Sequence, residues 1–218
     1  MLGELLQREP WIDSVETITT TAIPICTARA TSPDIAGRVP VVLDISFVAA
    51  DHNGARAVMA VREILRCYPL LKPLVMYTKG LLKQHQLGNA FTGGLSPYAT
   101  VLLAAHFLGR SPPYENLGHA YLSFLHFLGH GLDPTRDVVK LSITLQCLEA
   151  LPEVAHAAVP VAPAAGAMVT IVDPTNPANN VGRTAFRFNE VQAVAQQTLF
   201  FLTQPPRNGP LPLATARR

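Results

Sequence analysis

The sequence predicts an α/β chain in which a pair of strands precedes a mostly helical body. Residues 15–27 and 39–49 are rich in Val, Ile and Thr, a composition typical of strands. From Gly54 onward, apolar residues recur at helical intervals instead. Because 49% of the 218 residues are hydrophobic and 15% are charged, the chain can bury one good core or two small ones.

The second predicted strand carries an acid where local propensity disfavours one. Alternate residues from Val39 to Phe47 are apolar and share one face, whereas Asp44 falls on the other. Residues 28–38, between the two strands, are predicted to form a polar turn. An acid in this place is either a solvent-facing side chain or a metal ligand presented at the edge of a sheet.

Helices are predicted for most of the remaining chain. They cover residues 55–67, 73–87, 99–108, 117–130, 137–150 and 187–203. Pro73 lies in the first turn of its helix, where its missing N–H costs nothing. The helices are interrupted by a loop at residues 91–98, a low-complexity connector at 158–167 and a short strand at 169–173, and residues 204–218 are predicted to be a disordered tail.

Two of the four lysines lie close together. Lys79 and Lys83 are four residues apart on a predicted helix, so their ammonium groups share one face. Like charges repel there unless an anion lies between them, and a triphosphate would supply that anion. The alternative is an ordinary solvated helix face, and the spacing alone does not exclude it.

The loop FTGGLSPY precedes an apolar helix. Glycine-rich turns that lead into a helix N-terminus are common anion sites, because glycine permits backbone conformations closed to other residues. Tyr98, at the end of the loop, is able to stack on a nucleobase. A plain connection between helices, with a core tyrosine, is the alternative.

The segment DPTNPANNVGRT (173–184) is dense in turn-forming residues. Asp173, Asn179 and Asn180 offer directed hydrogen-bond donors and acceptors. Amide side chains suit adenine, whose edge alternates donor and acceptor. An ordinary long surface loop is the alternative.

Histidines and cysteines predict neither a metal centre nor a disulfide framework. His126 and His130 have the spacing of a helical metal pair, but no Glu follows the first and no third ligand is evident, so we interpret them as core or surface histidines. Three widely spaced cysteines favour a reducing intracellular compartment. No signal peptide or membrane span is expected, and a net charge of +2 means that any RNA contact is local.

Three stretches in this order resemble the non-canonical poly(A) polymerases of the DNA polymerase β-like nucleotidyltransferase superfamily, the TRAMP-type adenylyltransferases above all. They are VPVVLDISF with the NG that follows, LKPLVMYTKGLLKQHQLGNAFTGGLSPYATVLL, and DPTNPANNVGRTAF. The resemblance runs from about residue 8 to about residue 200. It implies that residues 1–50 are the C-terminal remnant of a catalytic palm sheet and that residues 51–203 form a helical central domain.

The resemblance implies a role for the matching residues of the first two stretches. Asp44 resembles the third catalytic carboxylate, a ligand of the Mg²⁺ (or Mn²⁺) that activates the primer 3′-hydroxyl. Asn53 falls where the family contacts the ribose of the incoming nucleotide. Lys79 and Lys83 match the pair that holds the triphosphate, and Tyr98 matches the ring that stacks on the base.

The third stretch resembles the family's nucleotide recognition motif. It implies that Asp173 and Asn179 lie near the base edge and that Arg183 belongs to the nucleotide-binding set. Uridylyltransferases often carry a histidine at the position of Asn179, so asparagine favours ATP. The loop before Tyr98 departs from the family, which usually has Ser-Ser-Tyr or Gly-Ser-Tyr there. Pro97 replaces a hydroxyl that helps to bind phosphate, and Ser96 is expected to compensate in part.

The implied reaction is the template-independent transfer of AMP from ATP to RNA 3′ ends. The implied partners are ATP, an RNA 3′ end and the RNA-binding and helicase proteins of a TRAMP-like complex, with no membrane and with the nucleus favoured as compartment. The family's Gly-Ser motif and Asp-x-Asp pair would lie upstream of the printed sequence, so residues 1–218 by themselves are expected to be inactive. A non-catalytic nucleotide-binding or scaffold module, a terminal uridylyltransferase and a piece of a longer active enzyme remain as alternatives.

Overall fold

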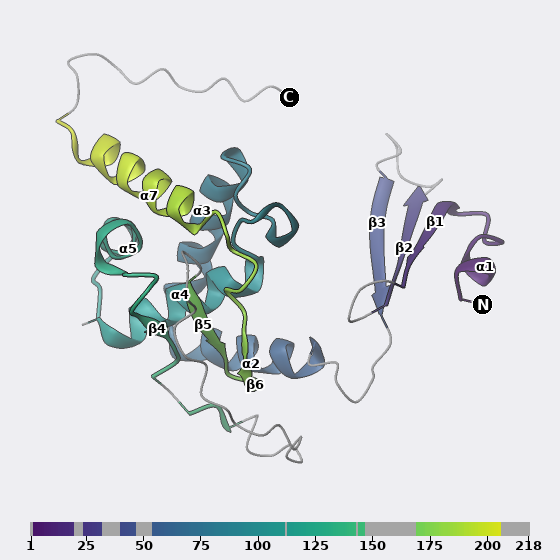
Figure 1. Cartoon of the computed structure of the whole chain (residues 1–218), viewed down its shortest axis with the longest axis horizontal. Coiled ribbons are helices and arrows are strands. Elements are labelled where there is room, and N and C mark those ends of the chain that lie inside the picture. Colours follow the sequence, from purple (N-terminus) through teal and green to yellow (C-terminus); the bar gives the residue numbers. More distant parts are fainter. Residues whose placement is uncertain are drawn as a thin grey trace. The chain divides into compact units, whose positions relative to one another are not determined.

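The chain forms two compact units in the computed structural model, residues Met1–Ala55 and Arg56–Arg218 (Figure 1). The residues that the structure describes are 2–19, 24–31, 40–46, 54–111, 113–142, 144–146 and 169–205. Asn53, the connector at 158–167 and the tail from residue 206 onward therefore lie outside the described residues.

The first unit is an antiparallel sheet with one short helix. Its elements are α1 (Leu2–Leu6), β1 (Ile12–Ile18), β2 (Ile25–Thr31) and β3 (Pro40–Ser46), and the strands pair in the order β1-β2-β3. Ile12, Ala28 and Ala30 form its small buried cluster, and Leu6 and Leu43 pack against them. The sheet therefore has an apolar face covered in part by α1.

The structure divides into two strands a segment of the first unit that was predicted to be one. Residues 15–27 were predicted as one strand, but β1 ends at Ile18 and a second strand begins at Ile25, directly after Pro24. Proline has no N–H to give to a ladder, so it separates strands. Residues 28–31, predicted as part of a turn, continue β2 because their alanines pack on the buried face; the rest of that turn, 32–38, lies outside the described residues.

The β3 strand follows the predicted alternation only in part. Leu43 and Ile45 are half-buried, as the pattern required, and Asp44 is exposed on the opposite face. Val41, predicted to share the apolar face, is 49% exposed, and Val42 is 51% exposed. The sheet's apolar surface at this end of β3 is thus uncovered within the described part of the unit.

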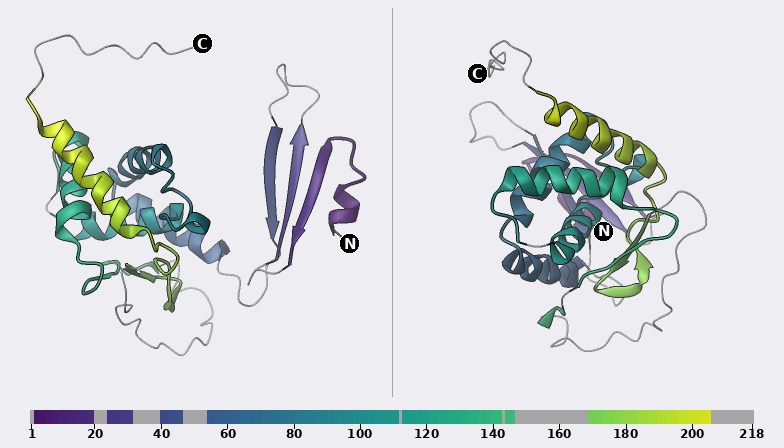
Figure 2. Two further views of the ribbon diagram at one scale, coloured as in Figure 1. Left: turned by 45° about the horizontal axis from the view of Figure 1, so that its top comes forward. Right: turned by 90° about the vertical axis from the view of Figure 1, so that its left-hand side faces the viewer.

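The second unit is a helical body with a small sheet at one side (Figure 2). Its elements are α2 (Gly54–Cys67), α3 (Leu71–Gln84), η1 (Ala90–Thr92), α4 (Pro97–Arg110), α5 (Leu117–His126), η2 (Phe127–Gly131), β4 (Val138–Val139), β5 (Thr170–Asp173), β6 (Asn176–Asn180) and α7 (Phe188–Thr203). The strand β5 pairs parallel with β4 and antiparallel with β6. The predicted helices at 55–67, 73–87, 99–108 and 187–203 and the strand at 169–173 are confirmed, with ends shifted by a few residues.

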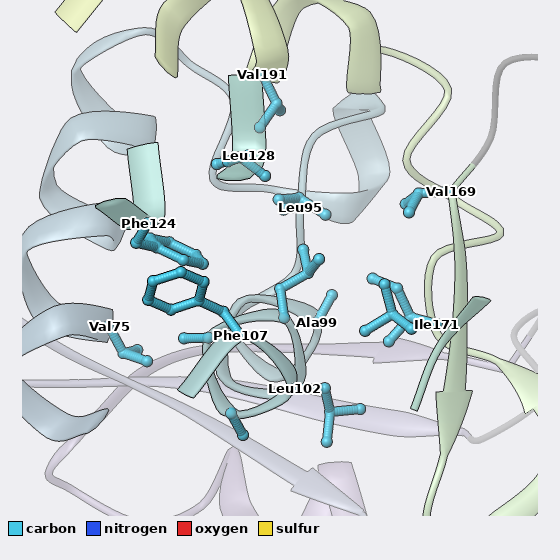
Figure 3. Packing of buried hydrophobic residues seen from close by; sticks show 14 of the residues in the cluster. Val75, Leu95, Ala99, Leu102, Phe107, Phe124, Leu128, Val169, Ile171 and Val191 are labelled. Atoms are coloured by element: carbon cyan, nitrogen blue, oxygen red, sulfur yellow. The ribbon is translucent and has the colours of Figure 1, made fainter. Parts of the chain in front are cut away.

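A single hydrophobic cluster joins the helices of the second unit to its sheet (Figure 3). Leu102 and Phe107 of α4 lie at its centre, Phe124 reaches it from α5, Ile171 from β5 and Val191 from α7. Both α5 and η2 pack against α7. Because α4 is buried on most of its faces, the two ends of this helix are held in fixed places relative to β5 and α3.

Two predictions for the second unit are corrected by tertiary pairing. Residues 137–150 were predicted as a helix, but Val138 and Val139 form β4 because their β-branched side chains suit the strand beside β5. Gln146 is helical, and residues 143 and 147–150 lie outside the described residues. Residues 173–184 were predicted as a loop, yet 176–180 form β6. The helix predicted to end at residue 130 changes at Phe127 to a wider i→i+5 turn. No helix among the described residues is long and apolar enough to cross a membrane.

Candidate functional site

A buried carboxylate at the end of β5 organises a polar network. Asp173 is 4% exposed. Its Oδ1 accepts hydrogen bonds from the Tyr98 hydroxyl (3.0 Å), the Thr175 N–H (2.9 Å) and the Thr175 hydroxyl (2.7 Å). Its Oδ2 accepts one from the Asn179 amide nitrogen (3.0 Å). Three of the four bonds end on Oδ1 and one on Oδ2, so donors from three residues hold the carboxylate in place.

The Tyr98 hydroxyl is held as a donor in this network. Burial raises the pKa of Tyr98 above the ordinary value for a phenol, and the negative charge of Asp173 raises the pKa further. The hydroxyl therefore keeps its proton throughout the physiological range. The ring is half-buried, so the part of it outside the network is accessible to a partner.

The hydrogen bond to Asp173 fixes which way the amide of Asn179 points. A carboxylate only accepts hydrogen bonds, so the NH₂ end of the amide must face Asp173. The remaining N–H and the carbonyl oxygen of Asn179 are then available in a set order. Such an amide can read one pattern of donor and acceptor on a base and rejects the reverse pattern.

The side chain of Asn180 bonds to the backbone of its own unit. Its Oδ1 accepts from the backbone N–H of Ile171 (2.9 Å) and of Gly182 (2.8 Å), which joins β5 to the turn after β6. A Cβ at Gly182 would lie 2.2 Å from the Val169 carbonyl oxygen, so this close approach requires glycine. Arg183 follows with an exposed side chain, and its backbone N–H donates to the Asn180 carbonyl (3.2 Å).

Lys79 and Lys83 line one pocket of about 680 Å³ in the second unit. It lies between α3, the turn that follows it and the first turn of α4; its other lining residues are Met76, Gly80, Leu82, Gln86, Gly88, Asn89, Thr92, Leu95, Pro97 and Thr100. Both lysines are exposed, neither forms an ion pair within the described part of the chain, and no acidic residue lines the pocket. The pocket is therefore cationic.

The N-terminus of α4 opens beside the same pocket. Pro97 is the first residue of α4 and lines the pocket, and Ser96 caps the helix by accepting a hydrogen bond from the Ala99 N–H (3.0 Å). A helix N-terminus adds partial positive charge. The Ser96 oxygen is engaged in the cap, although its O–H remains able to donate to an anion.

Close packing explains why the two positions in FTGG are glycine. Gly93 has φ +84°, and a Cβ there would lie 2.3 Å from the Phe186 ring. A Cβ at Gly94 would lie 2.1 Å from the Leu87 carbonyl oxygen. The loop is thus pressed against the chain on both sides, and the sequence interpretation of these glycines as anion-binding residues is not needed to explain them.

Asp44 belongs to the first unit, whereas the residues described above belong to the second. It is exposed on β3, and its Oδ1 accepts a hydrogen bond from the Thr27 hydroxyl on the neighbouring strand (2.7 Å). Within the described ranges no group of three or more His, Cys, Asp or Glu could hold a metal ion. One carboxylate does not by itself fit a Mg²⁺ or Mn²⁺ site, so these residues supply a single ligand at most.

Several site residues were not anticipated from the sequence. Thr175 supplies two of the four hydrogen bonds to Asp173, and its position two residues after an aspartate is the usual signal of an Asx turn. Asn89, Thr92 and Thr100 line the lysine pocket. No periodicity or motif marked them, because a loop and two helices bring them together only in the folded chain.

Known proteins share this fold and part of the sequence. No protein-family model matches the chain. Poly(A) RNA polymerase gld-4 of Caenorhabditis elegans is 30% identical over 159 residues, which are 68% of this chain and 18% of that protein. The curated relatives that it matches are much longer, and the chain spans about a fifth of the length of the first two.

Two solved structures have the same fold. The polymerase core of TRAMP, an RNA surveillance complex, aligns with a TM-score of 0.69 at 22% identity, over 93% of this chain and 62% of that one. A histidine-to-asparagine variant of the Cid1 poly(U) polymerase, bound to MgATP, aligns with a TM-score of 0.58 at 20% identity, over 88% of this chain and 69% of that one. At these identities the likeness establishes the mixed α/β fold that this chain shares with both structures.

Proposed function

Because this chain belongs to the non-canonical poly(A) polymerase family, we propose that it is the nucleotide-recognition part of an RNA 3′-terminal adenylyltransferase. The reaction is the template-independent transfer of AMP from ATP to an RNA 3′ end with release of pyrophosphate. The observation that carries the proposal is the hydrogen-bond network of Tyr98, Asp173 and Asn179 beside a cationic pocket. Tyr98 directly follows Pro97, which lines that pocket.

The cationic pocket supports a triphosphate as ligand. Two lysine ammonium groups and a helix N-terminus lie around a space without acidic residues, and a triphosphate carries the charge that would relieve the repulsion between the lysines. Lys79 and Lys83 would act as point charges on the phosphate oxygens. The role of Ser96 would be one donated hydrogen bond, since its oxygen already caps α4.

The polar network supports a planar base with a donor–acceptor edge. The half-buried ring of Tyr98 offers a stacking surface, and its hydroxyl anchors the ring to Asp173. The free N–H and carbonyl of Asn179 match an edge with one acceptor and one donor, as adenine has. Asp173 is a positioning residue here, because it sets the order in which Asn179 presents the two groups. The solved Cid1 variant with MgATP also carries an asparagine introduced for a histidine.

Metal chemistry and partners follow from the same proposal. When bound, Mg²⁺ (or Mn²⁺) would neutralise the developing phosphate charge, and this chain would contribute Asp44 as one of its ligands. The RNA 3′ end is the proposed acceptor. We propose RNA-binding and helicase proteins of a TRAMP-like complex as partners, and the nucleus as compartment, on the likeness to the TRAMP polymerase core.

Nucleotide binding by the chain itself tests the proposal without requiring catalysis. Titrating ATP and UTP against a fluorescent ATP analogue should give tighter binding of ATP. Lys79→Ala and Lys83→Ala should each weaken ATP binding roughly ten- to hundredfold, because a hydrogen bond to a charged group contributes about 1.5–3 kcal/mol. Lys72→Ala is the matched control, because Lys72 is an exposed lysine on the same helix that does not line the pocket. If the double lysine variant binds ATP as well as the parent chain does, the pair is only a solvated face.

A further inference from the structure

Two exposed histidines meet on the surface of the second unit. His126 is the last residue of α5, and His130 lies in the i→i+5 turn η2 that follows. Their ring centroids are 5.3 Å apart and the ring planes are inclined by 40°. Both side chains are exposed. The sequence spacing alone did not show that the two rings face one another.

The wider turn and the helix behind it hold this pair in place. His126 directly precedes the i→i+5 turn and His130 lies within it, so the pair spans the change from α5 to the wider turn. Gln192 of α7 donates to the carbonyls of Leu128 (3.3 Å) and Leu132 (2.9 Å), and Gln196 donates to that of Gly129 (2.6 Å). The backbone of the turn is thus bonded to α7, which fixes the place from which the His130 side chain projects.

The ring separation fits two ligands of one metal ion. With a zinc–nitrogen distance of about 2.0–2.1 Å, two imidazoles bound at a tetrahedral angle have centroids about 5 Å apart. The observed 5.3 Å is within reach of this value through small side-chain rotations. Neutral imidazole suits Zn²⁺, Cu²⁺ and Ni²⁺, whereas Mg²⁺ prefers oxygen ligands.

We propose that His126 and His130 form a two-histidine site for a divalent transition-metal ion on the surface of the second unit. The described residues contain no group of three ligands, so the other coordination positions are open to water or to a donor from another molecule. The site is independent of the proposed nucleotide function, because neither histidine lines the lysine pocket or joins the Asp173 network.

Calorimetric titration of Zn²⁺ into the full chain without a histidine tag tests the proposal. The Cys67→Ser background removes an exposed thiol that would otherwise compete for the ion. One ion should bind per chain, and His126→Gln and His130→Gln should each weaken binding at least tenfold. His85→Gln is the matched control, an exposed histidine of the same unit, and should bind as the parent does.

Thermal denaturation with and without Zn²⁺ gives the second readout. An ion that binds the folded chain stabilises it by RT ln(1 + [L]/Kd), so at one Zn²⁺ concentration the parent and the His85→Gln variant should show the same rise in the midpoint of unfolding and the two site variants a smaller one. Circular dichroism checks that the variants fold. Equal zinc affinity in the parent and in folded His126→Gln or His130→Gln would overturn the proposal.

Discussion

Replacing Asp173 by asparagine should reverse the order of donor and acceptor that Asn179 presents. Three donors converge on Oδ1 of Asp173, namely the Tyr98 hydroxyl and two groups of Thr175, whereas Oδ2 receives only the Asn179 amide. The introduced side chain will keep its single oxygen toward the three donors. Its NH₂ will then face Asn179, whose amide must rotate by half a turn to accept from it.

The size of the effect follows from the two hydrogen bonds that Asn179 has left. A net hydrogen bond is worth about 0.5–1.5 kcal/mol, so two matched bonds favour the correct base by about 1–3 kcal/mol, or roughly 5- to 150-fold. Asp173→Asn should remove the ATP-over-UTP preference of binding and shift it toward UTP. Asn179→Ala should remove the preference without reversing it, because no amide is left to turn.

Competition binding of ATP and UTP to the chain measures this ratio directly. Asp13→Asn is the matched control, since it makes the same chemical change on an exposed carboxylate of the first unit and should leave the ratio unchanged. Urea denaturation identifies variants that have lost the fold. A folded Asp173→Asn variant with the parent's ATP-to-UTP ratio would refute the proposed role of Asp173 as the residue that orients Asn179.

Three further outcomes are expected. Asn179→His should reduce the free-energy preference for binding ATP over UTP by about 1–2 kcal/mol, measured by the same competition. An unchanged preference would show that Asn179 does not contact the base edge. Gly94→Ala should lower the free energy of unfolding in urea by about 3 kcal/mol or more because its Cβ would press on the Leu87 carbonyl oxygen, whereas Gly80→Ala, with open space around it, should raise it by about 0.5–1 kcal/mol. Burial lowers the pKa of His106, despite the opposing hydrogen bond to the Lys140 carbonyl. Between the folded and unfolded pKa values of His106 the unfolded chain therefore binds more protons, and the free energy of unfolding should fall as the pH drops below about 6.5. The His106→Gln variant should lose that part of the pH dependence of unfolding in urea titrations across about pH 5–7.5.

Long apolar helices were predictable from the sequence, and short strands were not. The helices α3 and α4 carry uninterrupted helical periodicity over 14 residues each, so local pattern and tertiary packing agree. The strand β4 has two residues, Val138 and Val139, and exists because β5 lies beside it. A pairing between residues more than 30 positions apart leaves no local signal, which explains why a helix was predicted there.

The residue types of the candidate site were predictable from the sequence. The geometry of the site was not. The spacing of Lys79 and Lys83 predicted a shared face, and the structure places both in one pocket. The 75-residue separation between Tyr98 and Asp173 conceals their hydrogen bond from any local pattern. The assignments of nucleotide contacts to these residues, and to Asp44, Asn53 and Arg183, stay predictions that the binding experiments address.

Arg187, just before α7, joins the turn that lines the lysine pocket to the glycine loop before α4. Its N–H donates to the Gly93 carbonyl (2.9 Å), and its guanidinium reaches the carbonyl of Gln86 (3.4 Å), a pocket residue held at φ 57°. The turn after α3 and the glycine loop before α4 are therefore both bonded to one residue at the start of α7. A shift of α7 along its axis would pull on both segments together, so a contact made on this helix would be transmitted to the wall of the lysine pocket.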